Sequence, residues 1–274
     1  MISVVTAVLN GERYIDRCIQ VVIEQNCPSV EHIIVDGLSR DKTVEIVKKR
    51  ASEYSHIRWL SQKDRGQSDG LNTGIAMARG SIVGILNVDD YYELNVLNRV
   101  STIFAALKSP SLVVGNCRVW NDDDKLLYIN RPSKLKITDL LLGWDLNPHP
   151  VNPSAYFYHR SLHELIGPYS EQFGQDLPFL LSAVQIANVE YFDEVWGNYR
   201  EIEGTVTVKE RQSGVGKQRY DRVMANYRKQ LPVNKRIELA IKYCLRKGSR
   251  DVRSRLRTVL ESCRMCADKR KLKS

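Results

Sequence analysis

The chain has 274 residues, 43% of them hydrophobic and 27% charged, which is enough for one large domain or two small ones with a buried core. It has no apolar run of the roughly 18–20 residues that a spanning helix needs, no basic leader and no disulfide pattern among its six cysteines, so we expect a cytoplasmic protein that is neither secreted nor membrane-spanning. The net charge of +9 is uneven, because residues 205–274 carry 21 Lys and Arg against 6 Asp and Glu, a net +15, which leaves residues 1–204 at −6.

The first ninety residues alternate between two kinds of hydrophobic pattern. Short apolar runs predict strands over residues 3–9, 31–36, 57–62 and 81–88. Helical periodicity predicts helices over residues 12–25, about 41–53 with Ser39 as the N-cap, and 68–80 with Gly80 as the residue that ends the helix. This alternation predicts an α/β fold, with a mainly parallel, Rossmann-like sheet flanked by helices.

The second part of the chain, residues 91–204, is less regular. We expect a helix over 93–108, a strand over 111–119 that continues into a hairpin, and a loop rich in Pro, Asn and His over 146–154. The segment "AYFYHRSLHELIG" (155–167), an acidic step at 173–187 and a strand over 189–200 follow. Beyond Val215 the pattern is helical and basic.

Polar residues stand at the ends of the four predicted strands. They are Thr6 to Asn10, Asp36, Asp64 and the adjacent pair Asp89 and Asp90. Ligands of open α/β sheets bind beyond the carboxyl ends of the strands, so these groups should converge on one crevice. Two neighbouring carboxylates repel each other unless a cation meets them, and Mg²⁺ or Mn²⁺ prefers such ligands. The lone CxxC at 263–266 has no second pair, so we interpret it as incidental.

Three motifs in order carry a resemblance to a known family. They are "VDGLSRDKT", "SQKDRGQSDGLNTGIAMARG" and "ILNVDDYY", in residues 35–92. With the preceding "VVTAVLNGERY", this order resembles the family 2 glycosyltransferases, over roughly residues 2–205. The resemblance implies a GT-A fold, with residues 1–204 as the catalytic domain. Residues 1–90 would bind a nucleotide-sugar and residues 91–204 the acceptor, and residues 205–274 would form a basic helical extension.

The resemblance also implies donor-binding residues. Those implied for the base, ribose, sugar and diphosphate are Thr6, Val8, Glu12, Asp36, Asp64, Gly66, Asp69, Asn72, Asp89, Asp90 and Arg200. Asp89 and Asp90 would hold the Mn²⁺ or Mg²⁺ ion, and Arg200 would contact phosphate. The donor would be a nucleotide-sugar, of which a UDP-sugar is our first choice.

The base of the reaction is implied by "GPYSEQFGQDLPFLL", which resembles the family segment that carries it and assigns the role to Asp176. An inverting transfer needs a carboxylate that takes the proton of the acceptor hydroxyl. A negative charge at a helix start is also a common structural feature. His149 and Asn152 lie in a loop similar to an acceptor-side segment, and His149 is a candidate acceptor contact.

Two rival functions remain open. A nucleotide-binding protein without transferase activity is suggested by Asn87 and Gln175, which stand where many relatives have acids, and by Leu38, which replaces a small residue of the family turn. A dinucleotide oxidoreductase shares the early strand–helix pattern, but no G-x-G-x-x-G follows the first strand. We therefore expect a glycosyltransferase that acts on a saccharide or lipid-linked acceptor in cell-surface polysaccharide or glycolipid synthesis.

The basic extension has three interpretations. A solvated helical face is the simplest, and nucleic-acid binding is not expected, because no aromatic platform or known module accompanies the charge. Attachment to an anionic membrane surface is the interpretation we prefer, since each Lys or Arg near such a surface contributes about 1 kcal/mol. The protein would then lie peripherally at the inner face of the membrane.

Overall fold

A computed structural model of the chain describes residues 1–170 and 176–247. In this part of the chain one sheet of nine strands has the order β3-β2-β1-β4-β8-β6-β9-β5, and β7 pairs with β6 at the side. The strands are β1 (Ile2–Val8), β2 (Val30–Asp36), β3 (Ile57–Ser61), β4 (Ile82–Ile85), β5 (Tyr91–Tyr92), β6 (Ser111–Asn121), β7 (Leu126–Asn130), β8 (Tyr156–His159) and β9 (Asn188–Glu201). Strands β1 to β4 are parallel, whereas β8 runs antiparallel to β4 and β6.

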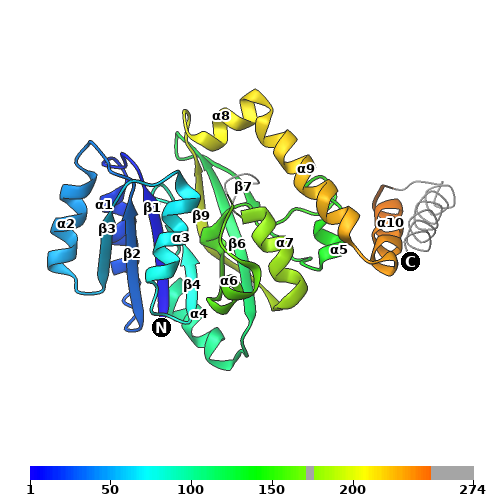
Figure 1. The fold of residues 1–274 in the computed structure, drawn as a ribbon, viewed down its shortest axis with the longest axis horizontal. Helices are drawn as coiled ribbons and strands as arrows, with labels where there is room; N and C mark the ends of the chain where they lie inside the picture. The colour runs from blue at the N-terminus through cyan, green and yellow to red at the C-terminus, as the bar shows by residue number, and fades with distance from the viewer. Residues whose placement is uncertain (171–175, 248–274) are drawn as a thin grey trace, which may run out of the picture.

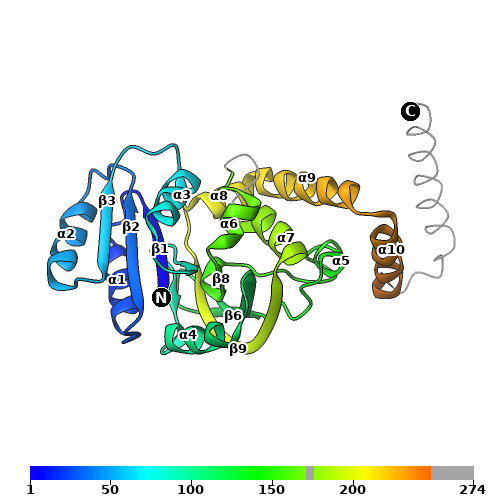
Figure 2. The same ribbon diagram turned by 60° about the horizontal axis from the view of Figure 1, so that its bottom comes forward.

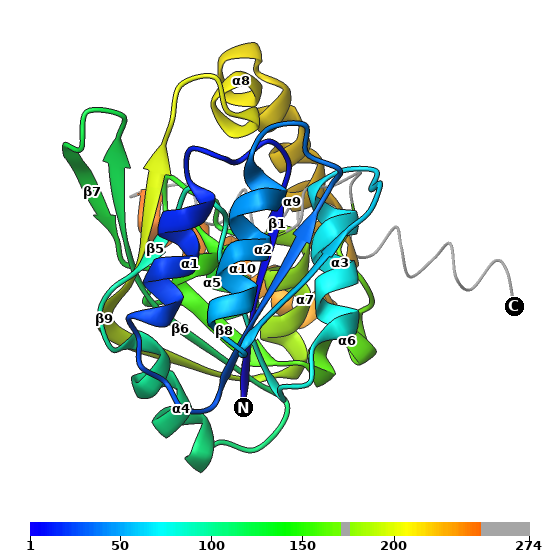
Figure 3. The same ribbon diagram turned by 90° about the vertical axis from the view of Figure 1, so that its left-hand side faces the viewer.

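Helices cover both faces of this sheet (Figure 1). They are α1 (Ile15–Ile23), α2 (Thr43–Glu53), α3 (Gln67–Met77), α4 (Val96–Ala106), α5 (Ile137–Leu140), α6 (Ser161–Ile166), α7 (Asp176–Ile186), α8 (Val206–Ser213), α9 (Val215–Gln230) and α10 (Val233–Lys247), with a 3-10 turn at Pro153–Ala155. Helices α1 and α2 lie on one face of the parallel strands and α3 on the other (Figure 3). The predicted α/β fold is confirmed.

Strand β1 shows how the sequence separates the two layers. Ile2 and Val4 belong to the cluster that includes residues of α1 and α4, whereas Val5 and Ala7 belong to the cluster of α3 and α7. Because successive side chains of a strand point to opposite faces, an unbroken apolar run places hydrophobic groups in both layers. The carboxyl ends of β1 to β4 therefore meet at one edge, and α8 lies beyond that edge (Figures 1 and 3).

Several details of the elements differ from the predictions, and three of them bear on helices α1, α2 and α3. Helix α1 begins at Ile15, three residues later than predicted. Ser39 does not cap α2; its hydroxyl accepts the backbone N–H of Asn10 (2.7 Å) instead. Gly80 does not end α3, which stops at Met77, and its N–H donates to the hydroxyl of Ser3 (2.9 Å). For Ser39 and Gly80 a contact from distant sequence replaces the local signal.

The described part of the basic extension, residues 205–247, packs against the body of the protein (Figure 2). Val223 and Met224 of α9 and Leu231 are buried in the cluster that contains α7 and the central strands. Helix α10 packs on α5, where Lys242 pairs with Asp139 (2.8 Å). The division into residues 1–204 and 205–274 stays a prediction about folding units, but α9 covers part of the core. None of the helices in the described ranges has the length and apolarity to cross a membrane.

Candidate active site

Asp89 and Asp90 follow β4 at the shared edge of the parallel strands. Asp90 is 3% exposed, and its Oδ2 accepts Nδ2–H groups of Asn87 (2.8 Å) and Asn152 (2.7 Å). Its Oδ1 accepts the backbone N–H of Arg200 (3.2 Å). Three donors from three segments therefore fix this carboxylate. Asp89 is partly exposed and accepts no hydrogen bond from another residue in the described ranges, which leaves its oxygens available to a ligand.

Burial and mutual repulsion disfavour the ionised forms of the two acids. Burial raises the pKa of Asp90 well above its ordinary value, and the neighbouring charge of Asp89 raises it further. Burial also raises the pKa of Asp89, which Arg200 opposes only in part. A bound cation would favour the ionised form of both groups. The pair is thus electrostatically suited to a divalent metal ion.

The residues at this edge fit Mg²⁺ or Mn²⁺ as one part of a ligand set. Among residues 1–170 and 176–247 there is no group of three or more His, Cys, Asp and Glu side chains that could hold a metal ion. Both ions readily complete their octahedron with water and phosphate oxygens. An open carboxylate at Asp89 beside a fixed one at Asp90 therefore fits an ion that arrives with a diphosphate, rather than a structural metal.

Asn87 has a structural role, although it stands where many relatives have an acid. Its Nδ2–H donates to Asp90, while its Oδ1 accepts from Nε2 of Gln67 (2.9 Å). An aspartate here would lose the donor and add a third negative charge. The amide thus orients Asp90 without increasing the repulsion.

A cavity of about 210 Å³ lies against the two acids. Arg13, in the turn before α1, and Arg17 of α1 line it together with Asp122 and Arg200. Arg200 pairs with Asp124 (2.8 Å), but its Nε is buried without a partner among the described residues. Cations thus surround the acids, which agrees with an anionic ligand in this cavity. Arg13 lies within the quoted stretch "VVTAVLNGERY", but the sequence assigned no role to it or to Arg17.

The loops after β1 and β2 are tied together by side-chain hydrogen bonds. Glu12 accepts the backbone N–H of Lys42 (3.0 Å), and its own N–H donates to Asp41 (3.0 Å). Asn10 accepts the N–H of Arg40 (2.9 Å). Glu12 is exposed at this edge as predicted for a donor contact, yet its carboxylate also holds the two loops in place.

Three other predicted donor residues are buried below the edge. Thr6 is fully buried, and its hydroxyl donates to the carbonyl of Leu86 (2.7 Å). Val8 is 4% exposed beneath α1. Asp36 is 1% exposed and accepts from Ser61 Oγ (2.6 Å) and from the backbone of its own turn. The structure does not bring these side chains to a surface, so their contacts with a base find no support in this geometry.

Asp64 and Gly66 shape the entry to α3. Asp64 Oδ1 accepts the N–H of Gly66 (3.1 Å), whose φ of 138° is one that residues with a side chain rarely adopt. The same carboxylate lies against Gly37, where a Cβ would come within 2.8 Å of Oδ2. This close packing joins the end of β3 to the end of β2.

Asp69 and Asn72 occupy α3 itself. Asp69 accepts from the guanidinium of Arg65 (2.9 Å), so its negative charge is already paired. Asn72 exchanges two hydrogen bonds with the backbone of Tyr169, both at 2.9 Å. Asn72 therefore ties α3 to the segment that follows α6.

Asp176 begins helix α7, with its side chain among tyrosines. Burial raises its pKa from 3.8 to about 6, and the hydroxyl of Tyr156, which donates to Oδ1 (3.1 Å), opposes that rise. A carboxylate with this pKa is ionised near neutral pH, yet it is more basic than an ordinary aspartate. Gln175, which precedes it, lies outside the described residues.

One short segment connects the two acidic regions. Asn152 donates to Asp90, and Tyr156, four positions later, donates to Asp176. A 3-10 turn separates them, and four residues span at most about 14 Å between Cα atoms. The metal-suited acids and the candidate base thus share one scaffold.

His149 lies in a small aromatic cluster just before this segment. Its ring is 4.9 Å from that of Trp144 and 5.7 Å from that of Tyr220, which stacks on it. Burial lowers the pKa of His149, so the imidazole is neutral, and its Nε2 is buried without a partner among the described residues. Trp144 is 36% exposed. Trp144 and His149 lie near each other in the sequence, but no local pattern could indicate that Tyr220 of α9 packs with them.

Two of the known proteins that match this chain are glycosyltransferases. The chain is 27% identical over 220 residues to the uncharacterized glycosyltransferase EpsJ of Bacillus subtilis, covering 76% of this chain and 63% of that protein. It is 26% identical over 184 residues to a PGL/p-HBAD biosynthesis glycosyltransferase of Mycobacterium tuberculosis, covering 63% of this chain and 64% of that protein. The chain thus spans just under two thirds of either relative.

Solved structures share the fold at low sequence identity. S. aureus TarS 1-349 in complex with UDP-GlcNAc superposes with a TM-score of 0.61 and 15% identity, over 96% of this chain and 91% of that chain. The mannosyltransferase PcManGT from Pyrobaculum calidifontis, in complex with GDP-Man and Mn²⁺, gives 0.63 and 17%, over 97% and 75%. These likenesses establish the fold that the resemblance implied.

The family assignment rests on the sequence model of glycosyl transferase family 2, which matches residues 3–167. That range runs from β1 to α6 and includes both strand-end acids, whereas Asp176 lies just beyond it. The match covers more than half of the chain, so the protein belongs to glycosyl transferase family 2.

Proposed function

We propose that the protein is a metal-dependent, inverting glycosyltransferase that moves a sugar from a UDP-sugar to a saccharide or lipid-linked acceptor. Cell-surface polysaccharide or glycolipid synthesis is the process that we propose for it. The observation that carries the proposal is the pair of carboxylate regions joined by residues 152–156. In one region burial and a second negative charge raise the pKa of Asp90, and the other holds a carboxylate whose pKa suits a base.

The donor end would use the strand-end acids. Asp89, with the fixed Asp90 behind it, would hold Mn²⁺ or Mg²⁺, and this ion would offset the charge that develops on the departing diphosphate. Arg200, whose Nε has no described partner, is placed to contact a phosphate oxygen in the same cavity. The UDP-GlcNAc of TarS supports a uridine donor, and the Mn²⁺ of PcManGT supports a divalent ion.

The transfer itself would use Asp176 as the base. Its carboxylate takes the proton from the acceptor hydroxyl while that oxygen bonds to the anomeric carbon of the donor. The bond between this carbon and the diphosphate oxygen breaks on the opposite face, and its electron pair leaves with the diphosphate. One displacement of this kind inverts the configuration of the sugar.

The acceptor would bind beside the aromatic cluster of Trp144, His149 and Tyr220. The half-exposed indole offers a flat apolar face, which suits the apolar face of a sugar ring. The unpaired Nε2 of His149 could exchange a hydrogen bond with a sugar hydroxyl. At most about 11 Å of chain separates His149 from Asn152, so an acceptor here lies within reach of Asp90.

The rival proposal is a nucleotide-binding protein of the same fold without transferase activity. Asn87 motivated it, but its amide has a structural role that needs no loss of activity. A panel of nucleotide-sugars tested for thermal stabilisation, with and without Mn²⁺, would identify the donor. The stabilising donor would then be incubated with saccharide and lipid-linked acceptors.

We expect one donor to raise the melting temperature only with the metal ion, and NMR of the product to show the inverted anomer. Stabilisation without any release of nucleoside diphosphate, with all acceptors, would favour the rival proposal. A product with retained configuration would contradict the single displacement at Asp176.

A further inference from the structure

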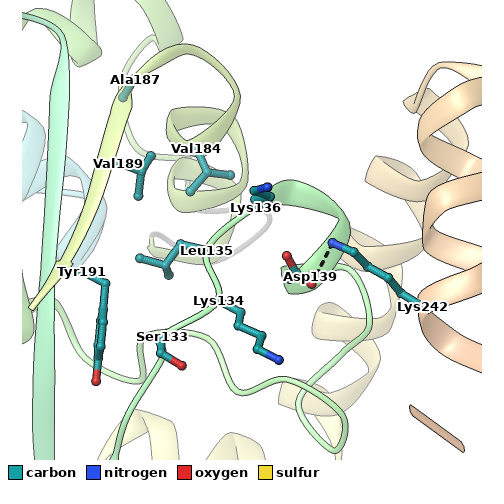
Figure 4. A pocket seen from close by; sticks show the side chains of 10 residues that line it. All are labelled: Ser133, Lys134, Leu135, Lys136, Asp139, Val184, Ala187, Val189, Tyr191 and Lys242. Atoms are coloured by element: carbon teal, nitrogen blue, oxygen red, sulfur yellow. Dashed lines mark hydrogen bonds and ion pairs between the residues drawn. The ribbon is translucent and has the colours of Figure 1, made fainter. Parts of the chain in front are cut away.

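A second cavity, of about 500 Å³, lies at the other end of α7 from Asp176 (Figure 4). Its walls come from the segment before α5, the last turn of α7, the start of β9 and α10. Helix α7 has 11 residues and rises about 1.5 Å per residue, so the cavity is roughly 12–16 Å from Asp176 along the helix. It is separate from the acids of the candidate active site, since β9 begins here and reaches Arg200 only near its far end.

One wall of this cavity is apolar. Leu135 is 8% exposed, and Val184, Ala187 and Val189 are partly buried side chains that pack against the same large core cluster. Figure 4 shows Leu135, Val184 and Val189 gathered around the space between α7 and the start of β9. The wall is therefore a part of the core surface that no described element covers.

The rim of the cavity is cationic. Lys134 and Lys136 are exposed, and neither ammonium group has an ion pair or hydrogen bond among the described residues. Lys242 of α10 pairs with Asp139 (2.8 Å) and Glu238 (3.1 Å), and Lys235 also pairs with Glu238 (3.0 Å). Lysines of α10 thus neutralise Asp139 and Glu238. The positive charges of Lys134 and Lys136 remain in excess at the rim.

We propose that this cavity binds an anionic membrane lipid. The lipid phosphate would lie between Lys134 and Lys136, and the first carbons of its chain would cover Leu135, Val184 and Val189. A free phosphate ion would leave the apolar wall exposed, and a neutral lipid would leave the lysines unpaired. The volume is within the range of pockets that hold small molecules.

The surroundings of the cavity support this occupant. Helix α10, which supplies Lys242, belongs to the region 205–274 with its net charge of +15, and such a region is attracted to an anionic leaflet. The cavity adds a specific lipid contact to that general attraction. This proposal concerns binding at a separate site, and it holds whether or not the protein transfers sugar.

The test measures sedimentation of the full chain with vesicles at low salt. One set is phosphatidylcholine alone, and the other contains equal parts of phosphatidylglycerol. We expect binding to the anionic vesicles, weakened about tenfold or more in the double variant Lys134→Gln/Lys136→Gln. The matched control is Lys48→Gln/Lys49→Gln on α2, which removes the same charge from an exposed face away from the cavity and should change binding little.

A second measurement tests the apolar wall without membranes. Octyl phosphate below its micelle concentration should raise the melting temperature of the wild type, whereas inorganic phosphate should not. Val184→Thr, which keeps the side-chain size but adds a hydroxyl, should reduce that shift. Circular dichroism would show that each variant is folded.

Three results would overturn the proposal. Equal losses of vesicle binding in the rim pair and the α2 pair would mean that only total charge matters. Equal stabilisation by inorganic phosphate and octyl phosphate would mean that the apolar wall takes no part. Failure of the wild type to bind anionic vesicles would remove the lipid altogether.

Discussion

The end of β4 and the start of α7 both carry carboxylates with raised pKa values, but the causes differ. At β4, burial acts together with a second negative charge, so Asp90 is disfavoured as an anion by its neighbour Asp89. At α7, burial is the cause that raises the pKa of Asp176, and a tyrosine hydroxyl stabilises the anion. The first region would therefore be completed by a cation and the second by a proton, which are the two partners that the proposed sugar transfer needs.

The largest effect should come from Asp176→Asn, which removes the proton acceptor. We expect the transfer rate to fall by about 10²–10⁴-fold, since general-base catalysis contributes that much. Nucleotide binding with Mn²⁺ should be unchanged, because Asp176 is not among the residues that we propose to bind the metal and the diphosphate. Initial rates and calorimetry measure the two quantities. Glu164→Gln, an exposed acid on α6, is the control and should retain both; full turnover in Asp176→Asn would assign the base elsewhere.

A loss nearly as large should follow Asp89→Asn. The rate should fall by about 10²–10³-fold, as when one electrostatic stabiliser of a transition state is removed. Here, unlike in Asp176→Asn, the thermal stabilisation by nucleoside diphosphate and Mn²⁺ should also disappear. Chelation of the metal from the wild type should produce the same two losses. If Asp89→Asn kept its metal-dependent stabilisation, the cation would not lie at β4.

A moderate effect should appear in the pH dependence. Asp176 must be ionised to accept a proton, so activity should rise with pH through about 6. Tyr156→Phe removes a hydrogen bond that lowers this pKa, so the rise should move upward, by about 0.5–1 pH unit. The pH–rate profile of both proteins is the measurement. An unchanged or downward midpoint would mean that the profile reports another group.

The smallest effect should come from Asn87→Asp, which acts on the cation region only. The change removes a donor to Asp90 and adds a like charge, so the free energy of unfolding without metal should fall by about 1–2 kcal/mol. Mn²⁺ should restore part of this loss by neutralising the extra charge. Urea unfolding with and without Mn²⁺ measures both. A variant as stable as the wild type in the absence of metal would contradict the repulsion we infer at β4.

The contrast between the two regions also marks how far the sequence could predict the site. Asp89 and Asp90 were found because a buried apolar run ends in two charges, which is a local pattern. The sequence also indicated Asp176 through a motif, but its pKa depends on burial in the folded chain, which raises it, and on Tyr156, twenty positions away, which lowers it. Thr6 was predicted as a contact from its place near the strand end. Thr6 is fully buried, however, because helices cover both faces of the sheet at this strand.

The sequence by itself determined the strand–helix order, the parallel first half and the acids at its edge, because periodicity and strand ends are properties of neighbouring residues. Only the tertiary structure decided which donors hold Asp90, that Arg13 and Arg17 border the acids, and that Tyr220 stacks on His149. It also decided that α9 covers the core and that lysines from α10 and the segment before α5 surround one cavity. These contacts join residues far apart in the chain, and they depend on how packed layers meet rather than on any local pattern.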